Sequence, residues 1–205
     1  MFKGPISIIS FLVVLSGCHK RCLPRQFQLS CGTVNINPDK DSIQVGDTLW
    51  VYCSIPANLK YNLGNNSLDS GSYNISGATN LGTDFHLTTP TGIGMQNGAI
   101  DSFSFISIKG IIQSNPLDIN ASKTIYYVTD SNKYNVSFGM VAQKKGVYIL
   151  VVLDVYQAMI KCDKLSVTIL MNDADNHLHY LKDIYYGGGT IDPLDLTHSY
   201  CFKVY

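Results

Sequence analysis

The sequence predicts a mainly β protein, a single antiparallel β-sandwich with one short helix near the C-terminus. All 15 acidic residues are Asp and none is Glu, and Asp is the poorer helix former of the two. Tyr, Ile, Val, Thr, Asn and Gly are plentiful, a composition that favours strands and turns. Segments that alternate apolar and polar residues recur at short intervals, which is typical of a sandwich.

The N-terminus predicts an export signal, which is absent from the mature protein and forms no part of the predicted fold. One positive charge, Lys3, precedes an apolar run from residue 6 to residue 15. This run is too short to span a bilayer, which takes about 20 residues. It leads into Leu15-Ser16-Gly17-Cys18, which resembles the lipobox of bacterial lipoproteins. We therefore expect residues 1–17 to be cleaved; the alternative is a buried N-terminal helix in which Cys18 is an ordinary thiol.

Cys18 is the expected lipidation site, and the membrane lipid bound through it is the first expected partner. Its thiol would carry diacylglycerol, and several acyl chains of the palmitate type hold a protein firmly at a membrane. Residues 18–25 are the expected tether, in which Lys20, Arg21 and Arg25 either touch anionic headgroups or are simply solvated. The expected location is the outer membrane of a bacterial envelope, on its periplasmic side.

The chain that remains, of 188 residues after the first 17 are removed from 205, predicts one sandwich domain over residues 26–205. Without Lys3 it has 14 basic and 15 acidic residues, a net charge of −1. A domain of this charge has no electrostatic basis for binding nucleic acid.

The first strands are expected at 26–29 and 34–36, followed by a clearer one at 43–55. In that strand residues 49, 51, 53 and 55 lie on one face, while Trp50 and Tyr52 lie on the other. Pro56 ends it. Residues 57–101 are rich in Asn, Ser, Gly and Thr, which indicates long loops around one or two short strands such as 83–88.

The second half of the chain has stronger strand patterns. Residues 144–146 are expected to be a hairpin turn, and residues 147–156, almost all apolar, a central strand buried on both faces. A helix is expected over 175–186, where Leu178, Leu181 and Tyr185 follow helical spacing and Gly187 ends it. The other expected strands are 103–112, 124–129, 134–143, 165–171 and 199–205.

Five cysteines remain beyond the anchor, an odd number that leaves at least one thiol outside any disulfide. Disulfides are permitted in an exported protein, but the spacing leaves their pairing open. Cys22 with Cys31 could close a short loop, and Cys53 with Cys201 could join the two sheets; Cys162 is the fifth. Zinc is the rival explanation, but the chain has no C-x-x-C motif.

Two patterns raise the question of catalysis or metal binding. Asp173, Asp175, His177 and His179 would converge in an extended chain, but in a helix the two histidines point about 200° apart. The helical spacing favours a helix cap with surface histidines, so no metal site is expected. The chain has no G-x-S-x-G motif, and neither His86 nor His198 has a local partner that marks a triad.

Trp50 and Tyr52 are the candidate binding residues. Two aromatic rings on one strand face could form a platform for a sugar or a peptide. The alternative is that they pack into the core, where aromatic side chains most often lie.

Several short motifs together resemble uncharacterised lipoproteins of Bacteroidetes-type bacteria. They are the lipobox, Val45-Gly46-Asp47-Thr48-Leu49-Trp50, Lys145-Gly146-Val147-Tyr148, Lys161-Cys162 and Cys201-Phe202-Lys203-Val204. The resemblance implies an immunoglobulin-like β-sandwich and transfers no active site. Surface-exported members carry acidic residues just after the anchor, where this chain has His19-Lys20-Arg21, and this favours the periplasmic side.

The leading functional hypothesis is a non-catalytic envelope module that binds a protein or glycan partner, with no catalytic residue and no cofactor. One alternative is a hydrolase of polysaccharide or peptide that uses two Asp carboxylates, which predicts a pocket lined by at least two Asp. Another is a structural subunit of an envelope assembly, which predicts a sizeable exposed apolar patch.

Overall fold

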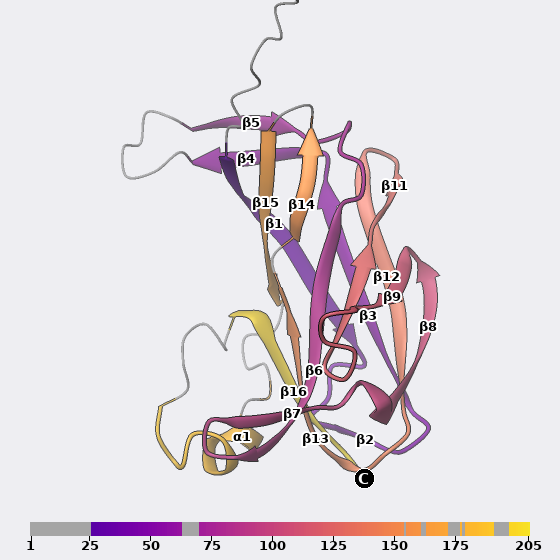
Figure 1. The fold of residues 1–205 in the computed structure, drawn as a ribbon, viewed down its shortest axis with the longest axis vertical. Coiled ribbons are helices and arrows are strands. Elements are labelled where there is room, and N and C mark those ends of the chain that lie inside the picture. The colour runs from indigo at the N-terminus through magenta and orange to yellow at the C-terminus, as the bar shows by residue number, and fades with distance from the viewer. Residues whose placement is uncertain are drawn as a thin grey trace, which may run out of the picture.

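The computed structural model describes residues 26–62, 70–153, 155–160, 163–171, 177, 179–190 and 197–205. The described chain is two β-sheets packed face to face with one short helix, which confirms the predicted mainly β sandwich (Figure 1). The expected signal peptide, Cys18 and the tether lie outside the described residues, as do Cys22 and Cys162.

The first sheet is built on the strand predicted most clearly, β3, with β12 on one side and β1 on the other. The short strand β11 continues the edge at β12, and the hairpin β4–β5 pairs with the start of β1. In spatial order the sheet runs β8 (Phe103–Lys109), β12 (Lys133–Ala142), β3 (Thr48–Pro56), β1 (Gln26–Asn37), β15 (Asp163–Met171) and β14 (Val155–Ile160), with β11 (Val128–Asp130), β4 (Asn58–Asn62) and β5 (Ser70–Asn74) at its margins.

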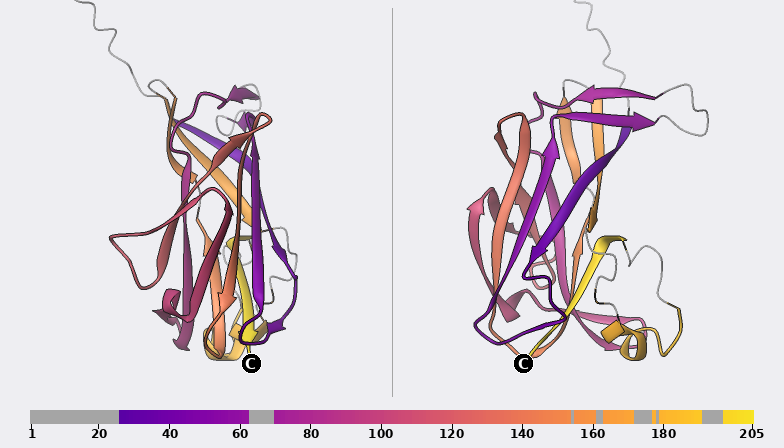
Figure 2. Two further views of the ribbon diagram at one scale, coloured as in Figure 1. Left: turned by 90° about the vertical axis from the view of Figure 1, so that its right-hand side faces the viewer. Right: turned by 180° about the vertical axis from the view of Figure 1, so that it is seen from behind.

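The second sheet lies across the core from the first, and the two layers separate in the view turned by 90° (Figure 2). Its strands run in the order β9 (Ile111–Ser114), β10 (Ser122–Tyr126), β6 (Gly82–Gly92), β13 (Gly146–Val152), β16 (Ser199–Val204) and β2 (Ser42–Ile43), and β7 (Met95–Gly98) folds back on β6. One pair, Tyr156 with Gly82, links the two sheets. The pairing is antiparallel except for β1 with β15 and β16 with β2.

The core fills the space between the sheets. Leu49, Val51, Cys53 and Ile55 of β3 are buried there, as their alternation predicts. From the facing sheet Phe85 stacks on Phe138 of β12, with ring centroids 5.2 Å apart. Each fully buried side chain of this size contributes about 1.5–3 kcal/mol through removal of apolar surface from water.

Residues 57–101 differ from the expectation of long loops. They contain β4, β5, β6 and β7, and β6 is a central strand of the second sheet. The short strand expected over 83–88 lies within β6. Phe85 and Leu87 point inward and are fully buried, while the intervening Asp84 and His86 are polar, a pattern that predicts a strand with one face in water rather than a central, covered one. Those polar residues lie on the outer side of the sheet, where later segments of the chain cover them.

Three predicted elements are corrected because the chain changes sheet inside them. The strand expected over 103–112 breaks at Gly110, whose φ of +91° lets β8 in one sheet pass into β9 in the other. The strand expected over 124–129 breaks at Tyr127, between β10 and β11. Residues 144–146 are no hairpin turn, since β12 and β13 belong to different sheets.

The strand expected over 147–156 likewise ends at Val152, and the chain continues as β14 in the first sheet. β13 is covered on its outer side by the helix α1 (His179–Ile184), where Ile149, Leu181 and Cys201 form a second apolar cluster. The helix begins later than predicted and ends at Ile184, two residues before the expected end at 186; Gly187, with a φ of +58°, lies in the turn that follows.

The two ends of the sandwich carry different parts of the chain. β1 starts at the end that holds the β4–β5 hairpin (Figure 1). The C-terminus, α1 and β7 lie at the opposite end, as the view from behind also shows (Figure 2).

Candidate functional site

The two predicted binding residues lie on the outer face of the first sheet. Tyr52 is exposed and Trp50 is half-buried, so neither belongs to the core between the sheets. In register, Trp50 lies between Asn37 of β1 and Gly139 of β12, and Tyr52 between Asn35 and Ser137. Directly paired residues share one face of a sheet. We call this surface the aromatic face; its members are Thr33, Asn35, Asn37, Trp50, Tyr52, Ser54, Asn135, Ser137 and Gly139.

Gly139 gives Trp50 its position. A Cβ added at residue 139 would lie 2.8 Å from Cζ3 of Trp50, closer than real Cβ atoms approach, so the indole lies over the bare backbone of this glycine. An aromatic ring that covers a strand glycine is a recurrent device that supplies the packing the glycine lacks. Trp50 is thereby held flat against the sheet, with Tyr52 beside it along the strand.

The nine residues of the aromatic face include no ionisable acid or base; at their margin Lys109 of β8 pairs with Ser137, and its Nζ lies 2.9 Å from Oδ2 of Asp130. The polar members of the face are Asn, Ser and Thr, whose side chains both donate and accept hydrogen bonds. A surface of this kind offers ring faces for apolar contact together with neutral polar groups. It is chemically suited to an uncharged partner that also combines apolar patches with hydroxyl or amide groups.

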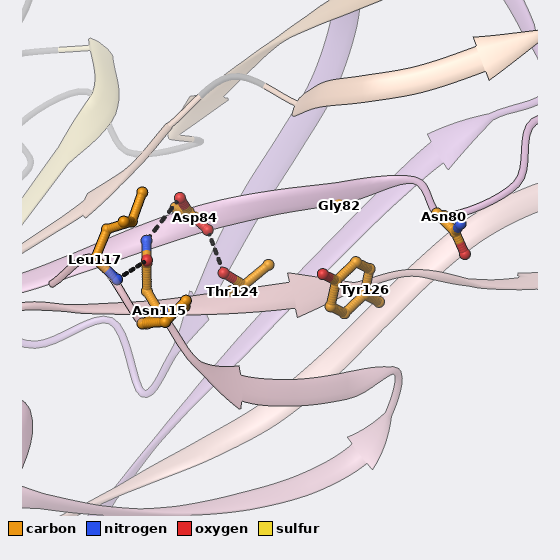
Figure 3. A pocket seen from close by; sticks show the side chains of 8 residues that line it. Asn80, Gly82, Asp84, Asn115, Leu117, Thr124 and Tyr126 are labelled. Atoms are coloured by element: carbon orange, nitrogen blue, oxygen red, sulfur yellow. Dashed lines mark hydrogen bonds between the residues drawn. The ribbon is translucent and has the colours of Figure 1, made fainter. Parts of the chain in front are cut away.

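A pocket of about 260 Å³ opens on the outer side of the second sheet, where β6 and β10 lie side by side (Figure 3). The segment after β9, with Pro116 and Leu117, forms one rim, and Asn80 lies at the other end. The polar and small positions Gly82 and Asp84 of β6 alternate with the core residues of that strand, so they point out of the core and into the pocket.

Asp84 lies in the wall of this pocket and is only 6% exposed. Thr124 donates a hydrogen bond from Oγ1 to its Oδ1 over 2.6 Å, and Asn115 donates from Nδ2 to its Oδ2 over 3.1 Å (Figure 3). Asn115 in turn accepts a hydrogen bond from the backbone N–H of Leu117, which shapes the rim. The carboxylate is therefore held in place by neutral donors from two segments of chain.

Tyr126 repeats on this sheet the arrangement of Trp50 on the other. A Cβ at Gly82 would meet Cδ1 and Cε1 of Tyr126 at 3.3 Å, so the phenol ring lies over that glycine. The residues that line the pocket include one acid, Asp84. The alternative of a hydrolase with paired Asp residues needs two carboxylates together, and this pocket does not supply the second.

His177 and His179 lie differently from the expectation of surface histidines on one helix. His177 precedes α1 with a φ of +52°, and its side chain is 12% exposed. Its Nε2 lies 3.5 Å from Oδ1 of Asp41, while Nε2 of His179 lies 3.8 Å from Oδ2 of the same Asp41. Nε2 of His177 also lies 3.4 Å from Oδ1 of Asp39, so the two imidazoles face the two carboxylates of the β1–β2 connection. Asp173 and Asp175 lie outside the described residues.

The proposed pair of Cys53 and Cys201 is wrong. Both are buried thiols, and they are not joined to each other. Cys53 belongs to the core between the sheets, where it accepts a hydrogen bond from the Tyr127 hydroxyl over 3.4 Å, whereas Cys201 lies on the outer side beneath α1. Burial, with a smaller contribution from the charge of Asp41, raises the pKa of Cys201 to about 12. Burial also raises the pKa of Tyr127 well above its ordinary value.

Within the described ranges, no three His, Cys or Asp side chains are arranged to hold a metal ion. In the same part of the chain, no helix is both long and apolar enough to cross a bilayer.

Comparison with known proteins gives structural likeness without sequence likeness. No family model matches the chain, and no curated protein matches it. The chain is similar in structure to the reeler domain of human F-spondin, with a TM-score of 0.38, 11% identity, and coverage of 89% of this chain and 99% of that one.

Two bacterial structures are also similar. A type II cohesin module of the ScaA scaffoldin of Acetivibrio cellulolyticus has a TM-score of 0.27 and 9% identity, and the alignment covers 68% of this chain and 95% of the module. A conjugative transposon lipoprotein from Bacteroides eggerthii has a TM-score of 0.24 and 14% identity, and the alignment covers 69% of this chain and 97% of that one.

Proposed function

We propose that this protein is an envelope lipoprotein, anchored through Cys18, whose sandwich domain binds a neutral glycan on the aromatic face without catalysing a reaction. The observation that carries the glycan assignment is the set of neutral polar side chains around Trp50 and Tyr52. Sugar rings present C–H faces that pack on aromatic rings and hydroxyls that both donate and accept hydrogen bonds, as the Asn and Ser side chains of this face do.

The anchor would orient the domain at the membrane. Seven residues separate Cys18 from Gln26, the first residue of β1. A fully extended chain spans at most about 3.6 Å per residue, which places the start of β1 within about 30 Å of the lipid. The end with β4 and β5 would then face the membrane, and the aromatic face, along the side of the sandwich, would remain accessible to a polymer.

Anchoring is tested by fractionation of the envelope. The wild-type protein is expected to sediment with membranes and to carry acyl chains on an N-terminal Cys18 when examined by mass spectrometry. The Cys18→Ala variant is expected to lose both properties. Identical soluble behaviour of the two proteins, or a purified product that retains Met1, would contradict this part of the proposal.

Binding is tested with the fluorescence of Trp50, the only tryptophan of the chain. The probes are starch, xylan, mannan and a mixed-linkage β-glucan. At least one is expected to change the emission in a saturable way, and Tyr52→Ser is expected to abolish the change. Tyr205→Ser is the matched control, since Tyr205 is 52% exposed and its ring contacts Lys203 away from this face.

A protein partner is the competing outcome. If no glycan alters the emission of Trp50 while a protein from detergent-solubilised envelope binds in a Tyr52-dependent way, the glycan assignment is wrong and the face is a protein-docking surface. If neither binds, the aromatic face is not a binding surface.

A further inference from the structure

The pocket on the second sheet combines a buried acid with an apolar rim. Asp84 lies in its wall, and Leu117, which is 94% exposed, lies close to it beside Asn115 (Figure 3). The ring of Tyr126, over Gly82, lines the pocket between them and Asn80 (Figure 3). An occupant of the pocket therefore contacts apolar and aromatic surface as well as a carboxylate.

The charge of this part of the face is negative. None of the residues that line the pocket is basic. Farther along β6, Nδ1 of His86 lies 3.8 Å from Oδ2 of Asp118. A lining with one acid and no base favours a cation over an anion.

The combination of apolar, aromatic and acidic surface selects among cations. A lysine-like group has an apolar four-carbon stem and a charged tip, and such side chains bury the stem along apolar surface while the tip finds a polar partner. Leu117 and Tyr126 match the stem, the face of an aromatic ring attracts an ammonium group, and Asp84 matches its charge. A bare metal ion would use none of the apolar rim.

We propose that this pocket binds an alkylammonium group, either of a free amine or of a lysine side chain on a partner protein. The site is separate from the aromatic face, since it lies on the other sheet and takes a charged group. It goes beyond the proposed glycan binding and does not depend on it.

The test compares Nα-acetyl-lysine methylamide with Nα-acetyl-norleucine methylamide, a neutral probe that keeps the four-carbon stem and lacks the ammonium group. Titration of the isotope-labelled domain is expected to shift the backbone amide signals of Thr124 and Tyr126 saturably with the first probe. The neutral probe is expected to bind at least about tenfold more weakly, because a buried carboxylate then loses its charged partner.

Variants identify the residue responsible. Asp84→Asn keeps the size of the side chain, removes its charge and is expected to abolish binding. Asp101→Asn is the control, since Asp101 is exposed and pairs with Lys144, 2.6 Å away, outside the pocket. Leu117→Ser is expected to weaken binding by a smaller factor. The comparison of the two probes uses the unaltered protein, so it tests whether the pocket prefers a charged group even if Asp84→Asn fails to fold.

Free L-lysine and cadaverine distinguish the source. Tighter binding of these small amines than of the blocked lysine indicates a free amine, and equal or tighter binding of the blocked lysine indicates a partner protein. Equal binding of the charged and the neutral probe, unaltered binding by Asp84→Asn, or no saturable shift at millimolar probe would overturn the proposal. Loss of glycan binding by Tyr52→Ser has no bearing on these outcomes.

Discussion

The two outer faces of the sandwich share one packing feature, but they differ in how far other segments cover them. On each face an aromatic ring lies over a strand glycine, Trp50 over Gly139 and Tyr126 over Gly82. The first face stays open, with Tyr52 exposed beside the indole. The second is covered, by α1 over β13 and β16 and by the segment after β9 over β6 and β10.

The difference follows from the residues that point outward. On the aromatic face most of them are Asn, Ser and Thr, which water solvates well. On the second sheet Val147, Ile149 and Val151 point outward and need an apolar cover, which Leu181 of α1 supplies. Asp84 of the same sheet also points outward, and the segment with Asn115 covers it and donates a hydrogen bond to its carboxylate. The cover of the second sheet is thus apolar over β13 and hydrogen-bonded over β6.

The largest effect is expected when the cover is weakened. Leu181 is 2% exposed, and Leu181→Ala should lower the free energy of unfolding by about 2–5 kcal/mol, through lost burial and the cavity left behind. Ile184→Ala, at a 41% exposed position of the same helix, is the control and should cost less than about 1 kcal/mol. Urea unfolding measures the free energy of unfolding of both variants. Equal values would show that packing of Leu181 against β13 does not stabilise the domain.

Alkaline pH should also destabilise the covered face. An ordinary thiol has a pKa of 9.0, and in the folded protein that of Cys201 is about 12. The unfolded chain therefore loses this proton from pH 9 upward while the native protein retains it, so the free energy of unfolding falls by about 1.4 kcal/mol per pH unit between pH 9 and 12.

Cys201→Ala removes this thiol and should flatten the decline between pH 9 and 10. The raised pKa of Tyr127 adds a further decline only above pH 10, the ordinary value for tyrosine. Unfolding in urea at pH 8, 9 and 10 measures the slope. An unchanged slope in Cys201→Ala would assign the alkaline loss to other groups.

Substitution of each glycine by alanine tests how closely the ring above it is packed. The Cβ of Gly139→Ala would lie 2.8 Å from both Trp50 and Thr48, so both side chains must move, and we expect a cost of about 1–3 kcal/mol. The Cβ of Gly82→Ala would meet its neighbours at 3.3 Å, and we expect less than about 1 kcal/mol. The emission of Trp50 should shift to longer wavelength in the first variant alone. A shift in both, or in neither, would show that the indole does not lie on Gly139.

The smallest effect on stability is expected at the open face. Tyr52→Ser removes a ring that is 38% exposed and should change the free energy of unfolding by no more than about 0.5 kcal/mol. Thermal unfolding of the variant and the wild type measures this. A loss of several kcal/mol would mean that Tyr52 serves packing, which was the alternative to a binding role.

The clearest prediction from the sequence was β3, because Leu49, Val51, Cys53 and Ile55 alternate with polar or aromatic residues. β6 was missed as a central strand since its outward residues are polar yet covered by other segments. No local signal distinguishes a polar residue that faces water from one that faces a covering loop. The pocket was missed for the same reason, as Asp84, Asn115 and Thr124 meet only through the pairing of β6 with β10 and the loop before β10.

Local pattern determined the fold class, the inner face of β3, the left-handed turn at Gly187 after the helix and the candidate residues Trp50 and Tyr52. These depend on the two-residue period of strands and on the freedom of glycine at positive φ, both of which are properties of neighbouring residues. Tertiary structure alone decided where the chain changes sheet, which outer face is covered, that Cys201 points away from Cys53 and that His177 turns toward Asp41. Each of these depends on contacts between segments distant in sequence, and their geometry is set by the packing of the two layers rather than by any single segment.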